Sequence, residues 1–353
     1  MPLSSSERAA ERGRAVAAMS GGVDSSVAAM LAAQGGVEVM GVSLGLPGAD
    51  AASARAVCSA LGIEHREEDA SAAFEARVLE PFIAAYAGGR TPNPCVICNP
   101  LVKFAALAGL ADELGCDGIV TGHYARVRRE VRAWHLLRAL DRGKDQSYML
   151  YRLPQSILAR LRVPLGELTK DEVRALADEA GLPVTERPES QDACFAPDGE
   201  VAALVAATRP DAARSGPILD RTGEEIGRHR GLAHYTVGQR RGLGIGGPGG
   251  PLYVLRIDAE RNALIVGAEE ELWVARCAAE DVAIVGEPPG PEFAARVVTR
   301  YRGTETPALV RLDGQRATIR FARPHRAPAP GQSAVFYCGE RLVGGGIIVP
   351  EPD

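Results

Sequence analysis

The segment at residues 20–26, Ser-Gly-Gly-Val-Asp-Ser-Ser, has the residue types that hold a phosphate group. It follows a short apolar run and precedes a run typical of a helix, so its N–H groups can surround an anion at the positive end of that helix. It lacks the lysine of the GxxxxGK[ST] loop and the spacing of the GxGxxG loop. Asp24 would be costly beside a phosphate unless a cation such as Mg²⁺ lay between them. The segment therefore predicts an ATP site with Mg²⁺ on Asp24, and the alternative is an ordinary turn.

Two cysteines, Cys95 and Cys98, follow two prolines in a second motif at residues 91–99. The prolines indicate a rigid loop, and the CxxC spacing suits half of a zinc site, a redox pair or a catalytic thiol with a neighbour. A zinc finger would need another closely spaced pair, which the sequence lacks. Cys194 follows a polar stretch at residues 189–192 and is a third candidate thiol, with a buried core cysteine as the alternative. The other cysteines are scattered singly and are predicted to be small core residues: Cys58, Cys116, Cys277 and Cys338.

The composition is that of a globular chain with two or three domains. The chain has 353 residues, 46% of them hydrophobic, and a net charge of -5. By inspection no apolar run approaches the roughly 20 residues of a membrane helix. The N-terminus lacks the apolar segment of a secretory signal, and the seven cysteines are an odd number. We therefore expect a cytoplasmic protein with reduced thiols and no membrane contact.

Arginine far outnumbers lysine among the basic residues, and several stretches of the chain are rich in arginine. A pI near 5.8 is not typical of a nucleic-acid binder, but a local basic face can bind RNA on an acidic protein. Arginine-rich stretches at 126–142, 221–241 and 296–326 are candidates for such a face, or are simply solvated surface. Of 40 basic residues only three are lysine, which suggests a specific use for a compact ammonium group: Lys103, Lys144 and Lys170.

Alternating apolar strands and helices up to about residue 185 predict an α/β fold with a doubly wound, mostly parallel sheet. The expected strands cover 15–18, 37–44 and 118–121, and the expected helices cover 26–34, 51–61, 103–114 and 170–181. Thr169 and Glu172 form a capping box at the start of the last helix. That cap gives Lys170 a structural explanation.

After about residue 205 short β-branched runs and turn residues predict β structure. Runs at 217–220, 251–257 and 263–266 indicate a small central β-rich domain. Five further runs, at 294–301, 308–312, 317–321, 333–338 and 342–348, indicate a closed β-barrel. We expect three domains, at 1–205, 206–275 and 276–353.

Six motifs occur in order along the chain: SGGVDSS at 20–26, GRTPNPCVICN at 89–99 with Lys103 and Phe104 after it, TGHYAR at 121–126, KDQSY at 144–148, ESQDACF at 189–195 and YTVGQRRGLGI at 235–245. Together they closely resemble the tRNA-specific 2-thiouridylases, the MnmA/TrmU family. The first motif alone resembles the wider N-type ATP pyrophosphatases, whose fold is of the adenine nucleotide alpha hydrolase type. The resemblance covers nearly the whole chain, and it implies that residues 1–205 form the catalytic domain and that the central domain at 206–275 contacts tRNA.

The resemblance implies conversion of the wobble uridine, U34, of certain tRNAs to 2-thiouridine. ATP would adenylate the C2 oxygen of the uracil, with release of diphosphate, and AMP would then be the leaving group. Sulfur would arrive as a persulfide on Cys194, delivered by a sulfur-relay protein or a cysteine desulfurase. Cys98 would help to free that sulfur by forming a disulfide with Cys194.

The resemblance also implies binding residues by motif position. Within the ATP site, Gly122 would let the nucleotide approach the backbone and Leu44 would pack near the adenine. His123 could be structural or could exchange a proton near neutral pH. A flipped uridine would enter a pocket lined by Asn93, Cys95 and Cys98. The implied ATP ligands are Ala18, Met19, Ser20, Gly21, Gly22, Val23, Asp24, Ser25, Leu44 and Gly122. The implied tRNA contacts are Asn93, Cys95, His123, Lys144, Asp145, Gln146, Arg300, Tyr301 and Gln332.

Cys95 departs from the family pattern, because many relatives carry aspartate there. A thiol with a pKa of roughly 8.5 is a poorer proton carrier at neutral pH than a carboxylate. Cys95, Cys98 and Cys194 could instead hold a [4Fe-4S] cluster with one open iron that binds free sulfide. Two further alternatives are a different carbonyl-adenylating pyrophosphatase and a tRNA-binding module whose loop is a relic.

Overall fold

The computed structural model describes residues 13–130, 132–184, 193–196, 200–245 and 250–350. Its first region contains a five-stranded sheet in the order β3-β2-β1-β4-β7, and every pairing in that sheet is parallel. The central strands are almost entirely buried, as parallel strands covered on both faces must be. The strands are β1 (Arg14–Ala18), β2 (Glu38–Leu44), β3 (Glu64–Glu68), β4 (Gly118–Val120) and β7 (Leu161–Arg162).

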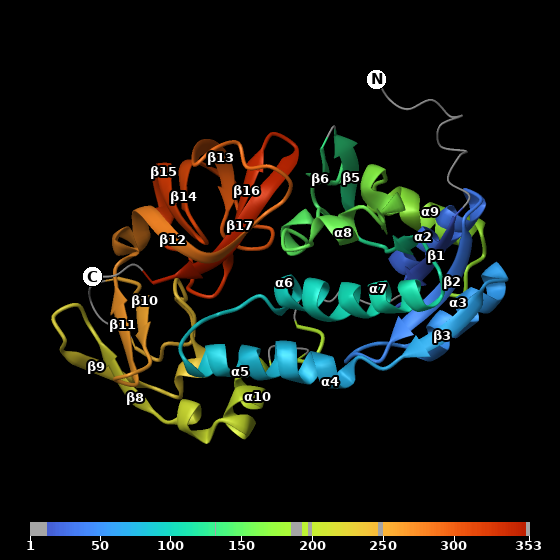
Figure 1. Cartoon of the computed structure of the whole chain (residues 1–353). Helices are drawn as coiled ribbons and strands as arrows, with labels where there is room; N and C mark the ends of the chain where they lie inside the picture. Colours follow the sequence, from blue (N-terminus) through green and yellow to red (C-terminus); the bar gives the residue numbers. More distant parts are fainter. Residues whose placement is uncertain (1–12, 131, 185–192, 197–199, 246–249, 351–353) are drawn as a thin grey trace.

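Helices cover both faces of this sheet (Figure 1). Side chains alternate along a strand, so Val16 joins one hydrophobic cluster while Ala15 and Ala17 join the other. The cluster of Val16 includes α7 (Phe104–Glu113), and the other includes α2 (Val23–Gln34), α3 (Ala51–Leu61) and α9 (Lys170–Glu179). The predicted doubly wound parallel sheet is therefore confirmed.

Local sequence signals set several helix boundaries. The backbone N–H of Ser53 donates to Asp50 Oδ1 at the start of α3 (3.0 Å), and the predicted capping box at Thr169 is present. Three consecutive helical segments lie outside the expected helices, although Asp69 marks the start of the first by accepting from the Ser71 N–H (2.9 Å). They are α4 (Ser71–Phe74), the π-helical η1 (Glu75–Leu79) and α5 (Glu80–Ala87).

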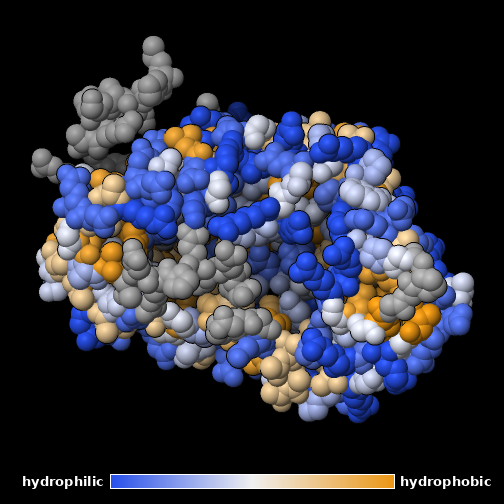
Figure 2. Space-filling model, turned by 180° about the vertical axis from the view of Figure 1, so that it is seen from behind, coloured by the Kyte–Doolittle hydropathy of each residue, from blue (hydrophilic) through white to orange (hydrophobic). Residues whose placement is uncertain are grey.

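Among the described residues one helix, Pro94–Glu113, is long and apolar enough to cross a membrane by length and composition, with a mean hydropathy of 1.6. It runs through α6 (Pro94–Cys98), the π-helical η2 (Asn99–Lys103) and α7. This corrects the expectation that no apolar run approaches that length. In the fold, 44% of its apolar window is buried, and α7 packs on β1 and β4 as a core helix does. On the face drawn in Figure 2, hydrophilic side chains predominate.

The β-rich part forms two units (Figure 1). The central unit is a four-stranded sheet of β8 (Gly216–Leu219), β9 (Glu225–His229), β10 (Tyr253–Asp258) and β11 (Ala263–Gly267), next to α10 (Val201–Thr208). The last unit is a barrel of six strands that closes through pairing of β12 with β17. Its strands are β12 (Trp273–Ile284), β13 (Glu292–Val298), β14 (Thr306–Asp313), β15 (Arg316–Arg326), β16 (Ser333–Cys338) and β17 (Arg341–Val349). The predicted β-rich domain and β-barrel are confirmed.

One hairpin joins the first region to the barrel. Strands β5 (Ala125–Glu130) and β6 (Ala133–Arg138) pair with each other, and β6 pairs with β17 through Leu136 and Leu137. No strands were expected here, because an arginine-rich stretch resembles solvated surface. The hairpin attaches the barrel to the first region.

Candidate functional site

The loop after β1 is built to hold an anion. Gly21 has a φ of 77°, a left-handed conformation that favours glycine, and it turns the chain from β1 into α2. The Ser20 N–H donates to Ser25 Oγ (3.2 Å), and the hydroxyls of Ser25 and Ser26 donate to the carbonyl oxygen of Gly22. The helix cap Gly22 has no side chain to accept from the first-turn N–H groups. Those N–H groups and the positive end of α2 therefore favour a phosphate.

The sheet order places this loop at a switch point. Strands β1 and β4 are neighbours in the sheet. After β1 the chain goes on to β2 on one side of this pair, whereas after β4 it goes on to β7 on the other side. In open α/β sheets ligands bind at the carboxyl ends of such strands. The loop after β4 contains Gly122 and His123 and lies against the loop after β1. The predicted ATP residues are thus brought to one edge of the sheet.

The structure gives Gly122 a different reason to be glycine from the expected approach of a nucleotide. A Cβ on Gly122 would lie 2.7 Å from the carbonyl carbon of Asp24 and 2.8 Å from the backbone nitrogen of Ser25. These are backbone atoms of a helix start and cannot rotate away. Gly122 is therefore required for the packing of the β4 loop on α2.

Replacing Gly122 with alanine is expected to lower the free energy of unfolding by about 1–3 kcal/mol, because the new Cβ overpacks a rigid contact. Denaturant unfolding followed by circular dichroism measures this change. The matched control is Gly109→Ala, an exposed position in α7 where a Cβ meets no atom within 4 Å. That control should gain about 0.5–1 kcal/mol from helix propensity. Equal stability of the Gly122→Ala variant and the native chain would contradict the packing argument.

Two side chains from other elements contact the carboxylate of Asp24. The hydroxyl of Tyr124 donates a hydrogen bond to Asp24 Oδ1 (2.8 Å), and Lys170 Nζ forms an ion pair with the same oxygen (2.7 Å). Lys170 is only 8% exposed, so its ammonium group lies inside the site and not on the surface. The capping box explains the start of α9 but not this contact. Sequence reasoning missed the role of Lys170, although the scarcity of lysine was a usable signal.

Leu44 is part of the hydrophobic core. It is 9% exposed and belongs to the hydrophobic cluster of Val42 and Phe74. Met19 is likewise buried, whereas Ser20 is exposed at the tip of the loop. The placement of Leu44 therefore favours the core over a face for adenine.

The three candidate thiols come together around Lys103. Cys98 is buried, and it is near enough to Lys103, Cys95 and Cys194 for each to act on its pKa. Desolvation raises the pKa of Cys98 to about 11, and the positive charge of Lys103 opposes that rise. Desolvation also raises the pKa of the exposed Cys194, again opposed by Lys103. Both thiols are free and would be protonated at neutral pH, and Lys103 is positioned to favour their thiolates.

The loop that carries Cys95 is fixed at its start. The side chain of Asn93 caps α6 by accepting from the Cys95 N–H (3.0 Å). The Thr91 N–H donates to the carbonyl oxygen of Pro330 (2.8 Å), and Gln332 Nε2 donates to the carbonyl oxygen of Thr91 (2.8 Å). The Thr91 hydroxyl also contacts Thr236 of the central unit. All three units of the chain therefore meet at this loop.

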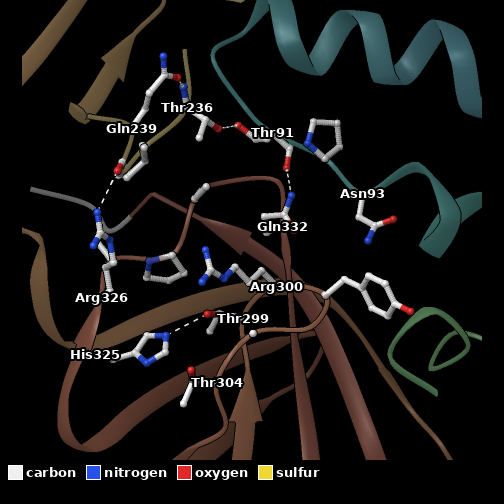
Figure 3. Close-up of a pocket in the computed structure, with 18 of the residues that line it drawn as sticks. Thr91, Asn93, Thr236, Gln239, Thr299, Arg300, Thr304, His325, Arg326 and Gln332 are labelled. Carbon is white, nitrogen blue, oxygen red and sulfur yellow. Dashed lines mark hydrogen bonds between the residues drawn. The ribbon is translucent and has the colours of Figure 1, made fainter. Parts of the chain in front are cut away.

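A cavity of about 1260 Å³ opens at this junction (Figure 3). Five of the predicted tRNA contacts line it: Asn93, Cys95, Arg300, Tyr301 and Gln332. They come from the α6 loop and from the barrel, regions far apart in sequence. Two other segments also line the cavity: the central-unit segment 236–239, which belongs to the motif at 235–245, and the barrel segment 323–329.

Four other predicted tRNA contacts do not line this cavity: His123, Lys144, Asp145 and Gln146. Asp145 accepts hydrogen bonds from the N–H groups of Ala139 and Ser147 and pairs with the buried Arg138. Gln146 Oε1 accepts from the Tyr124 N–H (3.0 Å). In this structure Asp145 and Gln146 shape their own loop.

His123 is held by its neighbours. Its Nδ1 lies 3.0 Å from Thr121 Oγ1, and its ring stacks on Phe104. Desolvation, aided by Lys103, lowers the pKa of His123 to about 3. The imidazole is therefore neutral at physiological pH, which favours a structural role for His123 over proton exchange near neutrality.

Three protein-family models match the chain in succession. They are the tRNA methyl transferase HUP domain over residues 13–198, the tRNA methyl transferase PRC-barrel domain over 207–268 and the Aminomethyltransferase beta-barrel domain over 274–348. The first match alone covers more than half of the chain.

Relatives match over almost their full length. The tRNA-specific 2-thiouridylase MnmA of Chloroflexus aggregans is 48% identical, over 94% of this chain and 97% of the relative. The protein of the same description from Paramagnetospirillum magneticum is 46% identical, over 96% of this chain and 95% of the relative. A solved 4-thiouridine synthetase–RNA complex with bound ATP aligns with 56% of this chain and 51% of its own, at a TM-score of 0.35 and 19% identity. That similarity is too low to carry an argument.

Proposed function

The chain belongs to the family of tRNA-specific 2-thiouridylases, and from that premise we propose that it catalyses ATP-dependent 2-thiolation of U34 in tRNA. It is then a tRNA-uridine 2-sulfurtransferase that forms AMP and diphosphate. One observation carries the proposal at the level of the site. Ala193, the neighbour of Cys194, lines the same cavity as Asn93 and Cys95, and Cys98 lies on the same short helix as Cys95 although Cys194 is far away in sequence.

The first half of the reaction uses the loop after β1. The N–H groups at the start of α2 would bind the phosphates of ATP, and the C2 oxygen of the uracil would attack the α-phosphorus. Diphosphate leaves, and the oxygen is converted into part of an AMP leaving group. Catalysis of this step is mainly positioning and charge stabilisation.

Asp24 suits a Mg²⁺ ion, because Mg²⁺ is typically held by one or two carboxylates together with substrate phosphates and water. Both contacts of Asp24 described above engage Oδ1, so Mg²⁺ would bind through Oδ2. The ion would supply positive charge for the departing diphosphate. Lys170 and Tyr124 orient the carboxylate for that role.

The second half uses the two thiols. A persulfide on Cys194 attacks C2 through its terminal sulfur, AMP leaves, and the base becomes joined to Cys194 through a disulfide bond. The thiolate of Cys98 then attacks Cys194 Sγ, which forms a Cys98–Cys194 disulfide and releases 2-thiouridine. A thiol reductant must afterwards reduce that disulfide. The sulfur donor would be a relay protein or a cysteine desulfurase, in the cytoplasm.

The alternative with a [4Fe-4S] cluster requires a different arrangement of the three cysteines. A [4Fe-4S] site needs Cys95, Cys98 and Cys194 converging on one centre. No group of three or more histidine, cysteine or acidic side chains within the described ranges is arranged to hold a metal ion. The persulfide route, by contrast, needs only two thiols to meet.

The test is single-turnover thiolation of a tRNA transcript by anaerobically purified protein. Iron and acid-labile sulfide are assayed first, and 2-thiouridine is then measured by mass spectrometry after addition of ATP and a persulfide donor. We expect one AMP and one diphosphate for each 2-thiouridine formed, in protein free of iron. Activity only in iron-loaded protein would favour the cluster. AMP formation that needs neither tRNA nor sulfur would instead favour another carbonyl-adenylating pyrophosphatase.

A further inference from the structure

The cavity at the domain junction is larger than the target uridine requires. Pockets that enclose one small ligand have volumes of roughly 300–1,000 Å³, and this cavity has about 1260 Å³. Its lining extends from Asn93 and Cys95, beside the thiols, to barrel residues 323–329. In Figure 3, Asn93 and Arg326 lie on opposite sides of the cavity with Arg300 between them. The cavity therefore has room beyond the place where a flipped base would meet Cys95.

Trp273 lines the cavity at the side away from the thiols. It is the first residue of β12, and its ladder partner is Arg326 of β15. Its side chain is 50% exposed, and it is one of four large hydrophobic residues that are exposed in the described part of the chain. Because half of its surface is exposed, the ring of Trp273 is not covered by the hydrophobic core and is accessible to a ligand in the cavity. Neither the sequence motifs nor the proposed chemistry assigns a role to Trp273.

The barrel wall of the cavity carries three arginines, Arg300, Arg323 and Arg326, of which Arg326 is ion-paired with Glu269. Arg300 and Arg323 are exposed and line the cavity, and both act on the pKa of His325, which desolvation and these two charges lower. His325 is fixed between the hydroxyls of Thr299 and Thr306 (2.9 Å each). The ring is therefore neutral and structural, and the two arginines are the groups that can contact phosphate. A cationic wall beside an exposed aromatic ring is the combination that binds single-stranded nucleic acid.

We propose that Trp273 is a stacking platform for a base next to U34, so that the cavity holds at least two nucleotides of the anticodon loop. This inference rests on the proposed function, since it takes tRNA as the ligand. Every base has a flat aromatic face, so such a contact tolerates different sequences. It would fix the strand beside U34 without restricting the enzyme to one tRNA.

The first experiment uses fluorescence. The chain has two tryptophans, Trp134 and Trp273, so Trp134→Phe leaves Trp273 as the sole reporter. Titration with an anticodon stem–loop RNA should quench that emission, and RNA that lacks one particular base of the two beside U34 should quench it less. Unchanged emission on binding of intact RNA would overturn the proposal.

The second experiment uses affinity. Trp273→Ala should weaken binding of the stem–loop RNA roughly 5- to 150-fold, the range for loss of one stacked base, whereas Trp273→Phe should retain most of the affinity. Trp273→Ala and removal of the stacked base from the RNA should together weaken binding no more than either change alone, because both remove the same contact. The control is Ile226→Ala, an exposed residue of β9 that does not line the cavity. Native affinity in Trp273→Ala refutes the platform but leaves the proposed function intact, since that function fails only if the native chain forms no 2-thiouridine.

Discussion

A Cys194→Ser variant is expected to lose 2-thiouridine formation by roughly 10³-fold or more, because a hydroxyl cannot carry the persulfide that attacks C2. The ATP loop lies on other elements, so ATP binding should stay close to that of the native chain. Formation of AMP-linked RNA should also persist, since adenylation precedes sulfur transfer. Mass spectrometry of digested tRNA measures the thiolation, and labelled ATP measures the adenylation.

The control for this variant is Cys338→Ser. Cys338 is a half-buried cysteine of β16 that donates to the carbonyl oxygen of Ala294 and does not line the cavity. It should retain native thiolation. Thiolation retained in Cys194→Ser would refute the role given to Cys194.

The Cys98→Ser variant distinguishes the two sulfur routes. In the persulfide route the thiouridine stays bonded to Cys194, because the attacking thiol is missing. A covalent RNA–protein adduct should therefore accumulate, and a thiol reductant should release it as 2-thiouridine. A cluster that delivers sulfide passes through no such disulfide, so the lack of any reducible adduct would argue against the persulfide route.

The fold was predictable where burial dictates the sequence. Buried parallel strands such as β1 and β2 must be apolar runs, and capping residues such as Thr169 mark their helix directly. The hairpin β5–β6 escaped prediction because its residues are rich in arginine, and its partner β17 lies about 200 residues away. Pairing across such a distance leaves no local pattern.

The candidate site was predictable where a motif carries the chemistry. The loop at residues 20–26 and the thiols were identified from residue types, and the structure brings the members of each group together. Lys170 was singled out only as one of three lysines and Trp273 was not identified, because the contacts of both side chains are made with neighbours that only the fold supplies. For Gly122 the structure supplies a second requirement for glycine, the contact with the backbone of α2, which the sequence does not reveal.

A Lys170→Met variant is expected to weaken ATP binding roughly 10- to 100-fold, the loss typical of a charge-assisted contact. The loop after β1 has no lysine of its own, and Lys170 places an ammonium group 2.7 Å from Asp24 at the start of α2. Without it, the carboxylate of Asp24 keeps its negative charge beside the phosphates. Lys170→Arg should recover only part of the affinity, because a fork-shaped guanidinium does not fit a space shaped for an ammonium group.

Comparison of nucleotides separates this charge effect from a loss of structure. ATP and diphosphate carry more negative charge than AMP, so the variant should lose more affinity for ATP than for AMP, as measured by calorimetry. Arg174→Met is the matched control, because Arg174 lies one turn along α9 in an exposed ion pair with Asp171. It should bind ATP normally, since exposed pairs contribute little. Equal losses for ATP and AMP in Lys170→Met would mean that Lys170 only supports the packing of α9 on α2, and the phosphates would then have to be held by the N–H groups of the loop alone.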